Sequence, residues 1–149
     1  MNGPMLSRQR GFSMMEVLVS ILVFSFGVLA LVQLQAASIR LSSDARYRAD
    51  AAFLADQLFA RMLISAEANA ADFAHRPGGT ACNSVGGDAS APSAAEWLLE
   101  VQEVLPGATP DLQQVTVNAA TGQVTVTLCW QQGNDVPRQY VVSNQIQWQ

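Results

Sequence analysis

The sequence predicts an α+β fold in which one long N-terminal helix packs on a small antiparallel β-sheet. Two observations lead to this class. Residues 12–76 contain no proline and a single glycine, Gly27, so nothing in them prevents a helix of about 50 residues or more. Near the C-terminus, apolar and polar residues alternate between turn residues, which is the pattern of half-buried strands.

The first half of the predicted helix, residues 12–34, is apolar and carries one charge, Glu16. A helix of that length extends about 34 Å, which is enough to cross a hydrocarbon core of about 30 Å. Arg8 and Arg10 precede the run and the next basic residue is Arg40, so we expect a single span with its N-terminus in the cytoplasm.

Glu16 is unusual because an ionisable group inside a membrane segment costs several kcal/mol unless it lies near the interface or has a partner. Two interpretations are open from the residues alone. The carboxylate can reach the lipid headgroups, since it lies four residues after Phe12, or it can pair with a cation supplied by another molecule.

Residues 10–19, Arg-Gly-Phe-Ser-Met-Met-Glu-Val-Leu-Val, resemble the class III leader of type IV prepilins and type II secretion pseudopilins. The resemblance implies the type IV pilin fold. It also implies that a prepilin peptidase removes residues 1–11 by cutting between Gly11 and Phe12, and that the new N-terminal Phe12 is methylated. Glu16 would then be the fifth mature residue, which in this family pairs with a neighbouring subunit's terminal amine.

The first 63 or so residues are similar to those of the PilV-type minor pilins, through residues 16–19, 26–35 and 46–62. One departure matters. Major pilins usually have a proline about twenty residues into the mature helix, whereas Gln33 stands there in this chain, so we do not expect a kink from that source.

This resemblance implies a minor pilin that helps to start assembly of a type IV pilus and contributes to its tip or adhesion. Its partners would be other minor and major pilins, the prepilin peptidase and the inner-membrane pilus assembly platform. Residues 12–34 would anchor it in the bacterial inner membrane and later line the filament core. Residues 35–149 would form a periplasmic globular domain that reaches the cell surface in the pilus.

Two other functions are compatible with the sequence. A pseudopilin of a type II secretion system would have the same leader and helix. A secreted enzyme or binding protein would instead have a signal peptide cleaved beyond Gln33. Gene context separates the first from a minor pilin, and the position of the mature N-terminus separates the second.

Composition argues against several other classes. All eight basic residues are arginine, against twelve acids, so the chain lacks the basic stripe of a nucleic-acid-binding protein. No P-loop, GxGxxG, GxSxG or HExxH motif is present, and we expect neither enzyme activity nor a cofactor. Two cysteines and one histidine, His75, are too few and too far apart for a structural zinc site.

Cys82 and Cys129 are the only cysteines, and the predicted topology puts both in an oxidising periplasm. Lone pairs of cysteines in exported domains usually form a disulfide, so we expect one here. The alternative is a buried Cys129 thiol and a free surface thiol at Cys82. His75 is expected at the surface, with Asp72 within reach if both are helical.

The remaining elements follow from local patterns. In the second half of the long helix, the predicted buried stripe comprises Ala45, Ala49, Ala52, Phe53, Phe59, Met62 and Leu63. Residues 77–92 are predicted to be a loop, and residues 93–96 a capping box for a short helix ended by residues 106–107. Strands are expected around residues 115–117, 124–130 and 140–148, with a turn at residues 121–122. Trp97, Trp130 and Trp148 are expected to be core or subunit contacts.

Overall fold

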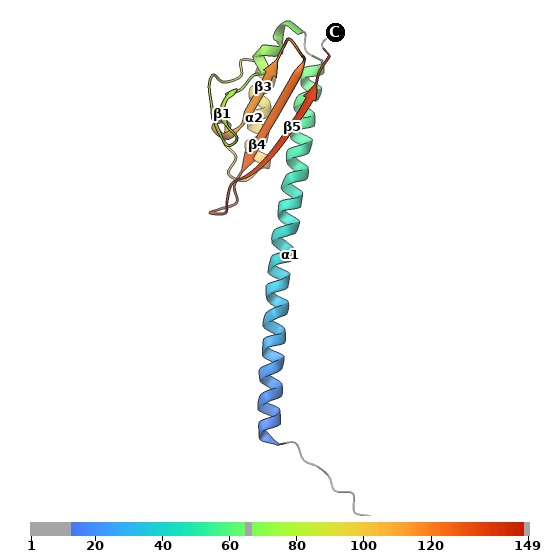
Figure 1. The fold of residues 1–149 in the computed structure, drawn as a ribbon, viewed down its shortest axis with the longest axis vertical. Helices are drawn as coiled ribbons and strands as arrows, with labels where there is room; N and C mark the ends of the chain where they lie inside the picture. The colour runs from blue at the N-terminus through green and yellow to red at the C-terminus, as the bar shows by residue number, and fades with distance from the viewer. Residues whose placement is uncertain (1–12, 65–66, 148–149) are drawn as a thin grey trace, which may run out of the picture. The chain divides into compact units, whose positions relative to one another are not determined.

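A computed structural model of the protein describes residues 13–64 and 67–147. The described chain has the predicted α+β fold with a long N-terminal helix (Figure 1). It has two small antiparallel sheets, one more than predicted. By compactness it divides into a unit ending at Ser43 and a unit spanning residues 44–149. In chain order the elements are α1 (Met14–Leu63), η1 (Glu67–Phe73), β1 (Gly78–Thr80), β2 (Asn83–Val85), α2 (Pro92–Val104), η2 (Pro110–Leu112), β3 (Gln114–Asn118), β4 (Gln123–Trp130) and β5 (Arg138–Gln145).

Helix α1 is continuous over 50 residues, which confirms the prediction made from the absence of proline. Its second half carries two ion pairs, each between residues four apart in the helix. Arg48 Nε lies 3.3 Å from Asp44 Oδ2, and Arg46 Nε lies 3.7 Å from Asp50 Oδ2. Asp44 is also 3.3 Å from Arg138 Nη1, so this carboxylate joins the helix to the start of β5.

The buried stripe of α1 differs from the predicted one. Of the predicted residues, Phe59 and Met62 are buried, whereas Phe53 and Leu63 are exposed. The observed stripe is Ala51, Leu54, Ala55, Leu58, Phe59 and Met62. This part of α1 is rich in alanine and has large apolar residues on more than one face, so periodicity alone does not select the face. The position of Trp97, whose Nε1 donates to the carbonyl of Leu54 at 2.8 Å, shows which face the core uses.

Three antiparallel strands form the main sheet in the order β3-β4-β5. Val126 of β4 is the register partner of Val115 in β3 and of Val142 in β5. Gly122, in the turn between β3 and β4, has φ +69°, and a Cβ there would collide with the carbonyl of Ile146, so the turn needs glycine. The strand pattern is confirmed, although β5 ends at Gln145. The predicted position of Trp148 lies outside the described residues.

One core joins these elements, with α2 behind the sheet in Figure 1. Trp97 and Trp130 are buried in it, with about 1% of their surface exposed, as expected for core tryptophans. The side chain of Arg61 fastens α1 to α2, because Nη1 donates to the Ser93 carbonyl at 2.8 Å and Nη2 to Glu100 Oε1 at 2.5 Å.

Two local predictions were wrong. Residues 77–92 are not all loop, since β1 and β2 form a hairpin in which Gly79 is the register partner of Ser84. Glycine and serine carry little strand signal, which explains why the pattern missed it. Helix α2 has no capping box. It begins at Pro92, whose fixed φ suits a first helical position, and no side chain caps it.

Candidate functional site

The apolar half of α1 is the first part of the candidate site. Every residue of the segment from 13 to 42 is exposed. Large apolar side chains such as Phe24 and Phe26, 72% and 66% exposed, project from it. By length and composition the helix could cross a membrane. A surface this apolar requires lipid or other helices around it.

Two serine hydroxyl groups in this segment donate hydrogen bonds within the helix. Ser20 Oγ donates to the carbonyl of Glu16 at 2.7 Å, and Ser25 Oγ donates to the carbonyl of Ile21 at 2.8 Å. These bonds to the preceding turn allow serine to lie in a nonpolar medium without an unpaired donor. Glu16 is the one charged side chain in residues 13–34.

Glu16 lies in the first turn of α1, where its backbone N–H donates to the carbonyl of Ser13 at 3.0 Å. A carboxylate is favoured at this end of a helix because the unpaired N–H groups carry partial positive charge. Among residues 13–64 and 67–147, no side chain pairs with the Glu16 carboxylate. The predicted cleavage position at Gly11 and Phe12 lies outside the described residues.

The two cysteines are joined in the structure. Cys82 and Cys129 form a disulfide across 47 residues of sequence, with their Cα atoms 5.5 Å apart. The bond links the β1–β2 turn, where Cys82 has φ +62°, to the C-terminal end of β4, the central strand of the main sheet. Gln113, fully buried, fixes the strand around Cys129, since its side chain accepts from the Cys129 N–H at 2.8 Å and donates to the Cys129 carbonyl at 3.0 Å. No local signal distinguished this glutamine in the sequence.

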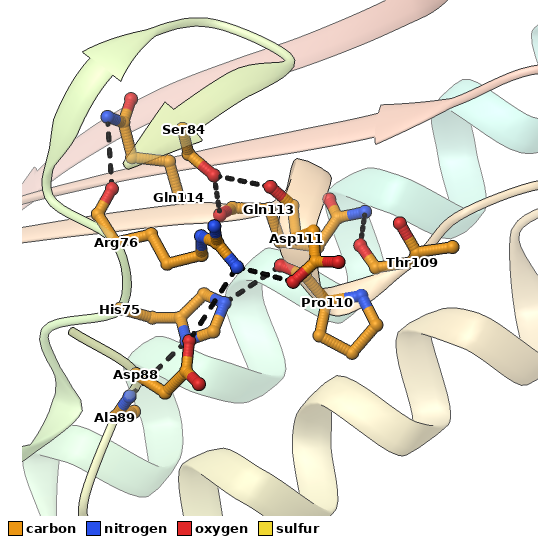
Figure 2. A network of polar contacts seen from close by, with 10 residues as sticks. All are labelled: His75, Arg76, Ser84, Asp88, Ala89, Thr109, Pro110, Asp111, Gln113 and Gln114. Carbon is orange, nitrogen blue, oxygen red and sulfur yellow. Dashed lines mark hydrogen bonds and ion pairs between the residues drawn. The ribbon is translucent and has the colours of Figure 1, made fainter. Parts of the chain in front are cut away.

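His75 is not at the surface, so that prediction was wrong. Its side chain is 1% exposed, and Figure 2 shows the ring between Pro110 and the backbone of Ala89. Nε2 lies 2.8 Å from the Pro110 carbonyl, and Nδ1 accepts from the Ala89 N–H at 3.3 Å. A carbonyl can only accept and a backbone N–H can only donate, so these two hydrogen bonds fit a ring with a proton on Nε2. Asp88 Oδ1 lies 3.7 Å from Nδ1.

The backbone of His75 is also engaged, because it forms an isolated bridge with Val115 of β3. Asp72, expected within reach of His75, instead accepts from Ser90 Oγ at 3.0 Å. Arg76 pairs with Asp111, and Ser84 Oγ lies 2.7 Å from the Asp111 carbonyl (Figure 2). This network holds η2 and the β1–β2 hairpin beside β3, which is a structural task.

Nothing in the described part of the chain resembles a metal centre, since no group of three or more His, Cys, Asp or Glu side chains there is placed to hold an ion. In the unit spanning residues 44–149, called the globular unit below, hydrogen bonds, ion pairs and the disulfide act together with the apolar core. The feature that the fold itself does not explain is the exposed apolar half of α1, in which Glu16 is the one carboxylate.

Comparison with known families identifies a Prokaryotic N-terminal methylation motif at residues 6–32. The match spans the basic leader, the junction at residues 11–12, Glu16 and most of the apolar run. No curated protein and no solved structure matches the chain. The motif supports a type IV pilin-like protein with a pilin- or pseudopilin-type structural role, processed by a prepilin peptidase. Together with the apolar helix it indicates membrane anchoring.

Proposed function

We propose that the protein is a minor pilin, incorporated into a type IV pilus, that helps to initiate pilus assembly and contributes to the tip or adhesive properties of the filament. The observation that carries this proposal is the methylation motif at residues 6–32, which continues directly into a 50-residue helix. Every described residue of its apolar half is exposed. A signal peptide alone would not need the continuous helix that follows.

In the proposed mechanism, the prepilin peptidase cuts between Gly11 and Phe12 on the cytoplasmic face, and Phe12 is methylated. The apolar segment stays in the inner membrane until the assembly platform moves the subunit into a filament. There the exposed side chains of residues 14–34 pack against other helices instead of lipid. The Glu16 carboxylate pairs with the terminal amine of a neighbouring subunit, which supplies the cation that a carboxylate in a nonpolar medium requires.

The mature N-terminus tests this proposal directly. We expect intact-mass analysis of the protein from its native host to show a chain that begins at Phe12 and carries one added methyl group. Gly11→Val should leave the uncut precursor in the membrane, because a branched side chain replaces the small residue before the cut. A mature chain that begins beyond Gln33 would refute the proposal and favour a secreted protein.

The methylation motif fits a type II secretion pseudopilin equally well, and a deletion strain separates the two. Loss of surface pili with normal secretion of exoproteins supports the minor pilin. Normal pili with lost secretion would assign the chain to the secretion filament instead.

A further inference from the structure

A groove of about 320 Å³ lies between the second half of α1 and the C-terminal half of α2, within the unit spanning residues 44–149. It is lined by Asp50, Phe53, Leu54, Gln57, Glu100, Glu103 and Val104. None of these residues belongs to the apolar segment or to the disulfide. The groove is therefore separate from the candidate site described above.

The groove combines an apolar surface with solvent access. Leu54 is 3% exposed, while Phe53 is 69% and Val104 42% exposed. An aromatic ring left this open beside a second apolar side chain contributes little to the fold of its own subunit. It offers a flat face on which a partner's side chain can lie.

Three carboxylates also line the groove. Helix α2 has no basic residue in its last turn, where cations are favoured, and instead places Glu100 and Glu103 near the negative end of the helix. Glu100 is held by Arg61. Asp50 has a weak, exposed pair with Arg46 at 3.7 Å. Among residues 13–64 and 67–147, no ion pair involves Glu103.

Gln57 also lines the groove. Its side-chain oxygen is shielded from solvent and accepts no hydrogen bond in the described structure. A shielded acceptor without a donor is unfavourable, and native proteins leave few of them. Solvent does not reach that oxygen, so the groups that the groove offers to a ligand are carboxylates, which only accept hydrogen bonds, and an apolar surface. The complementary ligand carries several N–H donors, a positive charge and an apolar stem.

We propose that this groove binds an arginine side chain, carried on an apolar segment of a neighbouring filament subunit. Arginine fits better than lysine because its planar guanidinium has five donors and stacks on aromatic faces. The stem lies along Val104 and the guanidinium over Phe53, beside the carboxylates of Asp50 and Glu103. The identity of the partner as a filament subunit rests on the proposed function, whereas the chemistry of the groove does not.

Photo-crosslinking of the full chain in its native host tests the proposal. A benzophenone-bearing residue replaces Val104 in the groove, and in a matched strain it replaces Val136, which is 78% exposed and outside the groove. We expect an adduct from position 104 whose crosslinked peptide comes from another subunit and contains an arginine within a few residues. Equal adducts from both positions, or a peptide without a basic residue, would overturn the proposal.

Charge removal provides the second test. The pair Asp50→Asn and Glu103→Gln should lower the yield of the position 104 adduct about tenfold, as expected for losing charge-assisted hydrogen bonds. The pair Asp56→Asn and Glu96→Gln removes the same charge from exposed positions of the same two helices and should leave the yield unchanged. An equal loss in both pairs, or a loss in neither, would refute a specific role for the groove.

The two proposals fail in distinguishable ways. A chain that keeps its leader and is absent from sheared filaments refutes the proposed function, whatever the groove binds. A processed chain present in filaments, but without the arginine-containing adduct, refutes the groove proposal and leaves the function intact.

Discussion

At the scale of single residues, Glu16 differs from the rest of the apolar segment because it is charged. It is the single charge in residues 12–34, and no described side chain pairs with it. The hydroxyl one turn later, that of Ser20, bonds to the Glu16 backbone carbonyl and leaves the carboxylate untouched. Under the proposed function, the partner of this carboxylate is the terminal amine of a neighbouring subunit.

We therefore predict that Glu16→Ala inserts into the membrane normally but is lost from filaments. Removing the carboxylate eases insertion by up to about 3 kcal/mol, so a weaker anchor cannot explain the defect. Recovery in sheared pili, relative to the membrane fraction, is the measurement. Ser20→Ala is the matched control and should be recovered like the wild type. Equal recovery of Glu16→Ala and Ser20→Ala would contradict the role proposed for the carboxylate.

His75, unlike Glu16, has a structural role, because its side chain binds groups of its own subunit. We predict that His75→Ala destabilises the globular unit by about 2–4 kcal/mol, because it leaves the Pro110 carbonyl and Ala89 N–H unpaired and opens a cavity. This corresponds to a fall in melting temperature of roughly 10–20 °C, measured by thermal unfolding in detergent. Asp88→Asn, at a side chain 74% exposed, should change it little. Similar melting temperatures for His75→Ala and the wild type would refute this.

At the scale of elements, the sequence predicted well what depends on local pattern. Helix α1 follows from the absence of proline, and β4 from the alternation of Val124, Val126 and Leu128 with polar residues. The burial of His75 could not be read this way. Its partners are the Pro110 carbonyl and the Ala89 N–H, backbone groups that any residue provides, brought together by tertiary packing.

The candidate site and the proposed groove differ in the same way. The methylation motif is a contiguous stretch of residues, so the sequence alone reveals it. The groove beside Phe53 is built from two helices about 50 residues apart in sequence, and no pattern within either helix predicts that they meet. The register of α1 against α2, fixed by Trp97 and Arg61, creates it.

The disulfide is a covalent link between the β1–β2 turn and β4. Its removal is predicted to lower the free energy of unfolding of the globular unit without affecting membrane anchoring. Closing a loop of 47 residues is worth about 4 kcal/mol on the chain-entropy model. We expect Cys82→Ala to lower the melting temperature of the globular unit in detergent, while the protein stays in the membrane fraction. A reductant should lower the wild type to the same temperature and leave the variant unchanged. A wild type that is insensitive to reductant would refute this.

At the scale of the whole molecule, the chain separates anchoring from folding. Residues 13–42 are all exposed, and the buried core begins at Ala51. The core is thus contained in the second unit, together with the disulfide and the hydrogen bond from Trp97 to Leu54. A unit of about 100 residues with its own core is large enough to fold alone.

We predict that a fragment of residues 44–149 folds as a soluble domain without the apolar segment. It keeps the whole buried stripe of α1, so it should melt cooperatively, within a few degrees of the same unit in the full chain. Near-ultraviolet circular dichroism of Trp97 and Trp130 should show fixed packing. A fragment of residues 56–149 is the control, because it lacks Ala51, Leu54 and Ala55 and removes the carbonyl that Trp97 binds. That loss of buried area and of one buried hydrogen bond should abolish cooperative melting. If the longer fragment also fails to melt cooperatively, the second unit does not fold independently, and the separation of anchoring from folding is wrong.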